Sequence, residues 1–109
     1  MCGINGIATR DISFPILKFG KEMNQLIRHR GPDDEGGVAF NNKGSFPLAY
    51  RDSVKRENSI PYLDFKNTDE IVDPNIWLGH RRLSILDLSR LGHCPMSDDS
   101  ERYWLTYNG

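Results

Sequence analysis

The sequence predicts an α+β fold with one main helix and several short strands. Apolar side chains recur at helical spacing between residues 15 and 30. Short runs of strand-forming residues stand before and after that stretch, separated by turn residues such as Gly, Pro, Asn and Asp. At 109 residues, 38% hydrophobic and 27% charged, the chain has the size of one small globular domain or part of a larger one.

Charge and hydropathy exclude several classes of protein. The net charge of −1 gives no general attraction to nucleic acid or to anionic membranes, so neither is expected as a partner. No apolar run approaches the ~20 residues of a membrane-spanning helix, and the N-terminus lacks the basic and apolar regions of a signal peptide. A cytoplasmic location is therefore expected, where the two cysteines, Cys2 and Cys94, would be reduced thiols.

The first elements in chain order are a strand and the helix. Residues 2–8 predict a short strand, and a helix is expected over residues 15–30, with Ser13 as its N-cap. Gly31 is expected as the C′ residue that ends the helix. The apolar face of this helix, interpreted as core, consists of Ile16, Phe19, Met23, Leu26 and Ile27.

The middle of the chain predicts a hairpin followed by an irregular stretch. Two strands are expected at 37–40 and 46–50, joined by a turn of Asn, Lys, Gly and Ser at 41–45. Residues 51–75 are polar and aperiodic, with two prolines and many charges. We expect this stretch to be a surface insertion.

The last third returns to strands. One strand is expected at 76–80 and another at 103–107, with a turn at 91–96 and an acidic hairpin tip at 97–100 between them. The chain ends on Asn108-Gly109, a pair that usually begins a turn after a strand, so we expect the polypeptide to continue.

Cys2 directly follows the initiator Met1. Removal of Met1 would leave Cys2 with a thiol and a free α-amine, and the amine titrates at lower pH than the thiol, so it can accept the thiol proton. A nucleophile and its base would then belong to one residue. Gly3 and Gly6 would allow a substrate to approach the backbone closely. The alternative is that Cys2 packs as a small apolar residue.

Two adjacent arginines, Arg81 and Arg82, enter an apolar run. Neighbouring strand residues face opposite sides, so we expect one guanidinium to point outward and the other inward. An inward guanidinium would suit a carboxylate ligand; the alternative is a pair of surface arginines. The charged stretch 28–36 is explained locally, as a basic helix end followed by a solvated acidic turn, and requires no site.

Taken together, these motifs resemble the N-terminal glutaminase domain of class II glutamine amidotransferases, in the asparagine synthetase branch. The matching segments are MCGI-x-G at 1–6, RHRGPD-x-x-G at 28–36, GHRRLSILD at 79–87, GHCPM at 92–96 and NG at 108–109. The resemblance implies an N-terminal nucleophile hydrolase sandwich, two mostly antiparallel sheets between helical layers, of which this chain would hold the N-terminal part. It also implies hydrolysis of glutamine to glutamate and ammonia for an ATP-dependent amide synthesis, in this branch that of asparagine from aspartate.

The resemblance also implies a role for particular residues. Cys2 matches the nucleophile that attacks the glutamine side-chain amide and forms a γ-glutamyl thioester, with its own α-amine as the base. Arg82 matches the arginine that binds the glutamine α-carboxylate, which makes it the inward one of the pair. Ile85, further along the same strand face, would line the same pocket. Asn108, through its side chain, and Gly109, through its backbone N–H, match the oxyanion hole.

Two departures from the family pattern accompany this resemblance. Cys94 stands where the family usually has glutamine. The glutamate and aspartate that bind the substrate α-amine, beyond the Asn-Gly pair, are not in this chain. The alternative to a glutaminase domain is therefore a truncated, catalytically inactive amidotransferase-like domain with an interaction or regulatory role.

No metal or cofactor is expected in this domain. Its cysteines and histidines show neither C-x-x-C nor H-x-x-x-H spacing, and there is no phosphate-binding glycine loop. ATP and magnesium are expected on a C-terminal synthetase domain that is absent from this chain, while glutamine is the ligand expected here. The sequence leaves open whether the chain forms a homo-oligomer.

Overall fold

The computed structural model describes residues 1–41, 48–51 and 73–109. Within these residues it holds one α-helix, two short 3₁₀ helices and six strands, and every strand pair is antiparallel. The elements are β1 Gly3–Ala8, α1 Ile16–Leu26, η1 Arg28–Arg30, β2 Asp34–Phe40, β3 Leu48–Arg51, β4 Ile76–Arg82, η3 Arg90–Gly92, β5 Met96–Ser97 and β6 Trp104–Leu105. The predicted α+β class, with one main helix and about six mostly antiparallel strands, is confirmed.

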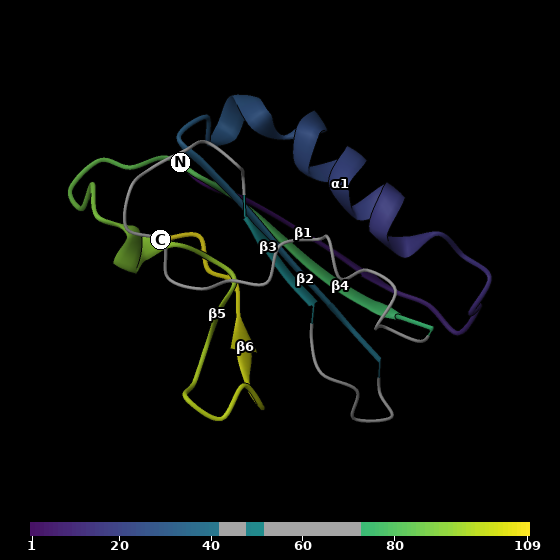
Figure 1. The fold of residues 1–109 in the computed structure, drawn as a ribbon. Helices are drawn as coiled ribbons and strands as arrows, with labels where there is room; N and C mark the ends of the chain where they lie inside the picture. Colours follow the sequence, from purple (N-terminus) through teal and green to yellow (C-terminus); the bar gives the residue numbers. More distant parts are fainter. Residues whose placement is uncertain (42–47, 52–72) are drawn as a thin grey trace.

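Four strands form one sheet in the order β1-β4-β2-β3, and β5 and β6 form a second, two-stranded sheet. α1 lies along one face of the larger sheet, where it contacts β1, β2 and β4 (Figure 1). The two chain ends lie near each other, at the end of the sheet where β4 finishes (Figure 1). A helix on an antiparallel sheet, with a second sheet beside it, is consistent with part of an N-terminal nucleophile hydrolase sandwich.

The core beneath α1 is centred on Trp77 of β4, which is fully buried and packs with Ile16 and Ala39. Gly20 of α1 lies against the indole so closely that a Cβ there would overlap the ring. The indole Nε1 donates a hydrogen bond to Asn5 Oδ1 at 2.8 Å, which satisfies the one polar group of the side chain.

Both arginines of the pair are buried: Arg81 is 2% and Arg82 9% exposed. The expectation that one of them points outward is wrong, because α1 covers the second face of the sheet. Arg81 Nη1 lies 2.5 Å from Glu35 Oε2, and Arg81 Nε donates to the Gly31 carbonyl at 2.9 Å. Gln25 of α1 donates to the same Glu35 oxygen at 3.1 Å, so the ion pair is enclosed by hydrogen bonds.

The helix begins without the predicted N-cap. Pro15 precedes α1, and no side chain caps its first turn. The Ser13 hydroxyl instead donates to Asp11 Oδ1 at 2.6 Å, which closes a small turn before the helix. A serine side chain that hydrogen-bonds to a neighbouring residue can no longer cap the helix. Sequence alone does not show which of these two hydrogen bonds the serine forms.

The helix also ends earlier than predicted, because η1 replaces its last turn. Gly31 has a φ of −150°, which is extended rather than the left-handed C′ conformation expected for it. A glycine is needed at position 31 for a steric reason, because a Cβ there would collide with the backbone of Arg81 and Arg82. The turn after η1 therefore packs directly on β4.

Strand positions agree with the prediction better than strand ends do. β2 begins at Asp34 rather than at residue 37, β3 covers 48–51 rather than 46–50, and β4 runs on to Arg82 rather than ending at residue 80. β6 holds only two residues of the predicted strand 103–107. Asp98 Oδ1 accepts the backbone N–H groups of Arg102 and Tyr103, each at 3.0 Å, so the hairpin tip extends into that stretch.

Most of the predicted hairpin turn at 41–45 and of the predicted insertion at 51–75 lies outside the described residues. Among the residues that are described, no helix has the length and apolarity to cross a membrane.

The contact of Gly20 with the indole predicts whether an alanine at this position raises or lowers the stability of the fold. At an exposed helical position, Gly→Ala stabilises by about 1 kcal/mol. Gly20→Ala is expected to destabilise by ~1–3 kcal/mol instead, because the methyl group overpacks against Trp77. Urea-induced unfolding measures this difference. Glu22→Ala, on the exposed side of α1, is the control and should change stability by less than about 0.5 kcal/mol; a stabilised Gly20→Ala would contradict the packing.

The buried ion pair predicts a second, non-additive effect. Glu35→Ala leaves the Arg81 guanidinium buried without its carboxylate and is expected to cost about 3–5 kcal/mol of unfolding free energy. The double variant Glu35→Leu/Arg81→Met removes the unpaired charge and should recover roughly half of that loss or more. Arg102→Ala, at an exposed arginine, controls for the loss of a cation. A double variant as unstable as Glu35→Ala would show that the unpaired charge is not the cause.

Candidate functional site

A cavity of about 390 Å³ opens where β4 ends, between the start of β1, the loop after β4 and the C-terminal residues. Four of the five predicted site residues line it: Cys2, Arg82, Ile85 and Gly109. The fifth, Asn108, is half-buried and is not among the lining residues. The cavity thus brings together residues from both ends of the chain and from β4.

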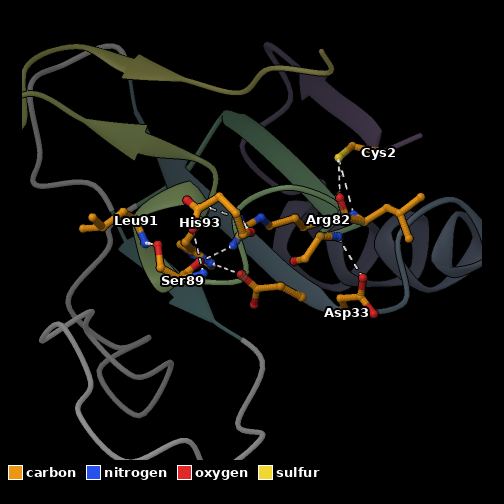
Figure 2. Close-up of polar contacts among 10 residues, drawn as sticks. Cys2, Asp33, Arg82, Ser89, Leu91 and His93 are labelled. Carbon is orange, nitrogen blue, oxygen red and sulfur yellow. Dashed lines mark hydrogen bonds and ion pairs between the residues drawn. The ribbon is translucent and has the colours of Figure 1, made fainter.

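Strand pairing places Cys2 in this cavity. β1 pairs with β4 so that Gly3 faces Arg81, which sets Cys2 beside the residues that end β4. The Leu83 N–H donates to Cys2 Sγ at 3.4 Å, and Sγ lies 3.8 Å from the Leu83 carbonyl oxygen. Figure 2 shows the sulfur directed at the backbone immediately after Arg82. Cys2 and Arg82 therefore line the same cavity.

The loop after β4 holds the Arg82 guanidinium in place. Nη1 donates to the Ser89 carbonyl at 2.6 Å, Nη2 donates to the Asp87 carbonyl, and the Asp87 carboxylate lies 3.7 Å from Nη2. Gly92 packs against the guanidinium with no room for a Cβ. A guanidinium carries five N–H groups, and these two hydrogen bonds fix its orientation at the cavity (Figure 2).

Ile85 lines the cavity but does not lie on the strand face predicted for it. β4 ends at Arg82, and Ile85 stands in the bend that follows, 72% exposed. Asp33 fixes the start of this bend: its N–H donates to the Arg82 carbonyl at 3.0 Å and its Oδ2 accepts the Ser84 N–H at 2.8 Å. The charged stretch 28–36, interpreted from sequence as a local helix end and a solvated turn, thus contacts the end of β4 directly.

Two buried histidines near the cavity were missed as site residues by the sequence interpretation. His80 is 2% exposed and lines the cavity, and its Nε2 lies 3.0 Å from the Tyr107 carbonyl oxygen. Burial lowers the pKa of His80 below its ordinary value, an effect that the bond to Tyr107 opposes. His93 Nδ1 lies 2.7 Å from Asp34 Oδ2 (Figure 2). The spacing of His80 and Arg82 on one strand face could have identified His80.

Cys94, the departure from the family pattern, is also a cavity residue. Its side chain is 5% exposed, and burial raises the pKa of its thiol, while a hydrogen bond with the Tyr107 backbone opposes that shift. Gly36 of β2 lies against the Cys94 carbonyl and the His93 ring with no space for a Cβ. The loop that carries Cys94 is thereby packed directly on the larger sheet. Among the described residues, no group of three His, Cys, Asp or Glu side chains is arranged to hold a metal ion.

Comparison with known proteins relates the sequence of this chain to a family. The family described as "Glutamine amidotransferase domain" matches residues 65–109. Two proteins of Methanocaldococcus jannaschii, "Putative asparagine synthetase [glutamine-hydrolyzing] 2" and "Putative asparagine synthetase [glutamine-hydrolyzing] 1", are 39% and 30% identical over 88% and 100% of this chain. "Asparagine synthetase [glutamine-hydrolyzing] 1" of Bacillus subtilis is 29% identical over 100% of the chain.

The alignments extend over nearly all of this chain but over little of those relatives. The chain spans 13%, 17% and 12% of the three proteins, respectively. No solved structure matches. The matched stretch 65–109 includes β4, the loop after it and the C-terminal pair, and together with the relatives it identifies a glutamine amidotransferase domain related to the asparagine synthetase family.

Proposed function

We propose that this domain hydrolyses glutamine to glutamate and ammonia. The observation that supports this most is the single cavity shared by the Cys2 thiol and the Arg82 guanidinium. A nucleophile and a carboxylate-binding cation at one small cavity match the two ends of a free amino acid with a side-chain amide.

Cys2 is the proposed nucleophile. Once Met1, which is exposed, is removed, the α-amine takes the thiol proton and the thiolate attacks the side-chain amide carbon of glutamine. The carbon–nitrogen bond breaks, the amine returns the proton to the leaving nitrogen, and ammonia departs. The resulting γ-glutamyl thioester is hydrolysed by water, which releases glutamate and regenerates the thiol.

The remaining predicted residues bind the substrate and stabilise the transition state. Arg82 pairs with the α-carboxylate through the N–H groups that the loop carbonyls do not occupy. Asn108 and Gly109 donate hydrogen bonds to the oxyanion that forms on the amide carbonyl, a contribution of roughly 10²–10³ in rate per donor. Ile85 gives the cavity an apolar rim beside the substrate methylenes.

We further propose that the ammonia serves a synthetase domain on the same polypeptide. The relatives that carry this domain are several-fold longer and are named for asparagine synthesis. ATP and magnesium would bind on that further domain, the amide acceptor would be aspartate, and the protein would act in the cytoplasm.

Replacement of the nucleophile is the direct test. In the full-length protein, Cys2→Ala is expected to lower glutamine hydrolysis by roughly three orders of magnitude or more, because the covalent step is lost. Asparagine synthesis from aspartate with added ammonium should continue, since free ammonia bypasses this cavity. Glutamate formation and asparagine formation are measured separately. Normal glutamine-dependent activity in Cys2→Ala would refute the proposal, whereas an inactive wild-type cavity beside intact ammonia-dependent synthesis would favour a non-catalytic amidotransferase-like domain.

Covalent labelling tests which thiol reacts. A glutamine analogue with an electrophile in place of its amide is expected to label Cys2 and to leave Cys94 unmodified at neutral pH. Cys94 is buried and its raised pKa keeps it in the thiol form, which is not the nucleophilic state. Peptide mass spectrometry locates the label, and excess glutamine should slow the reaction. In denaturant both cysteines should react with iodoacetamide; preferential labelling of Cys94 in the folded protein would contradict the assignment.

A further inference from the structure

The C-terminal residues reach the cavity without support from a strand ladder. β5 and β6 pair only through Met96 with Leu105 and Ser97 with Trp104. The chain beyond Leu105 continues to Gly109, which lines the cavity. An oxyanion hole is effective only when its donors are held in place before the reaction. The position of residues 106–109 must therefore be fixed by contacts other than β5–β6 pairing.

His80 provides such a contact. It stands on β4, on the face opposite α1, and its Nε2 lies 3.0 Å from the Tyr107 carbonyl oxygen. A carbonyl only accepts hydrogen bonds, so Nε2 carries the proton and donates. The ring is 2% exposed, and a buried donor that lost this acceptor would be left unsatisfied. The bond therefore ties the Tyr107 peptide to the rigid central strand of the larger sheet.

Cys94 lies close to the same residue. The charged and titratable groups around His80 are His93, Asp34 and Arg82, and the Tyr107 backbone is near enough to Cys94 to affect the pKa of its thiol. The contact that holds the Tyr107 backbone is thus the one made by the imidazole from β4. Tyr107 immediately precedes Asn108, so its orientation sets the direction in which the Asn108-Gly109 pair leaves.

We propose that His80 is a positioning residue, which by holding the Tyr107 carbonyl sets where the Asn108-Gly109 pair leaves and so places Gly109 at the cavity. This inference rests on the proposed glutamine hydrolysis. His80 acts on the backbone of Tyr107 and not on the substrate, because its Nε2–H already donates a hydrogen bond to the Tyr107 carbonyl. Its loss would weaken interactions made with the oxyanion, which exist only in the transition state, while Arg82 would still bind the ground-state substrate.

The test uses His80→Leu and His80→Gln in the full-length protein. His80→Leu removes the donor, and we expect kcat for glutamine hydrolysis to fall by roughly 10- to 100-fold, with KM for glutamine within about twofold of wild type. His80→Gln carries an amide nitrogen at a comparable reach and should restore most of kcat. His29→Leu, at an exposed histidine of η1, is the matched control and should leave kcat unchanged. Ammonia-dependent synthesis checks that the synthetase domain is intact in each variant, and thermal unfolding checks that the amidotransferase domain is folded.

A second readout does not depend on activity. Hydrogen–deuterium exchange of the peptide covering residues 103–109 should be faster in His80→Leu than in wild type, and unchanged in His80→Gln and His29→Leu. Unchanged exchange and kcat in His80→Leu would overturn the inference, as would a rise in KM without a fall in kcat, or a failure of His80→Gln to restore the function. A wild-type protein that hydrolyses no glutamine would refute the proposed function alone, and the exchange result would still decide the contact.

Discussion

The antiparallel pairing of β1 with β4 is the constraint on which the site depends. It brings residue 2 to the end of β4, across from the point where Arg82 and Leu83 leave the sheet. Because side chains alternate along a strand, a slip of one residue would exchange the two faces of β4. The arginine at the cavity would then turn toward α1, and Trp77 would leave the core. The register is fixed by the core, and the geometry of the site follows from it.

The alternation along β4 also separates two uses of the same side-chain type. Arg81 is enclosed with Glu35 beneath the helix, where it supports the packing of α1 on the sheet. Arg82, its neighbour, faces the cavity and is oriented by carbonyl groups of the following loop. Two identical neighbouring residues thus have different environments, one in an ion pair under the helix and one at the cavity, and the layer that covers each face of the sheet decides which is which.

Sequence reasoning located the main elements and named four residues that line the cavity, for identifiable reasons. The helix and strands follow from local periodicity, and the motifs with Cys2 and Arg82 carry their own chemical signal. The buried state of Arg81 could not be predicted, because it depends on α1 covering the second face. Ile85 was misplaced because Asp33 bends the chain after β4. The spacing of His80 and Arg82 could have placed His80 at the cavity, but its contact with Tyr107 could not be predicted, because a backbone carbonyl as partner leaves no trace in residue identity.

The close approach of Gly36 to the loop before β5 has a consequence for the size of the cavity. A hydrogen atom at that position, instead of a methyl group, lets the Cys94 carbonyl and the His93 ring rest on the sheet. Any larger residue at this position would push the loop with His93 and Cys94 away from the sheet, and Cys94 lines the cavity. The width of the cavity is thus set in part from β2, by a residue that does not line it, and a substitution there would change the size of the cavity without replacing any lining residue.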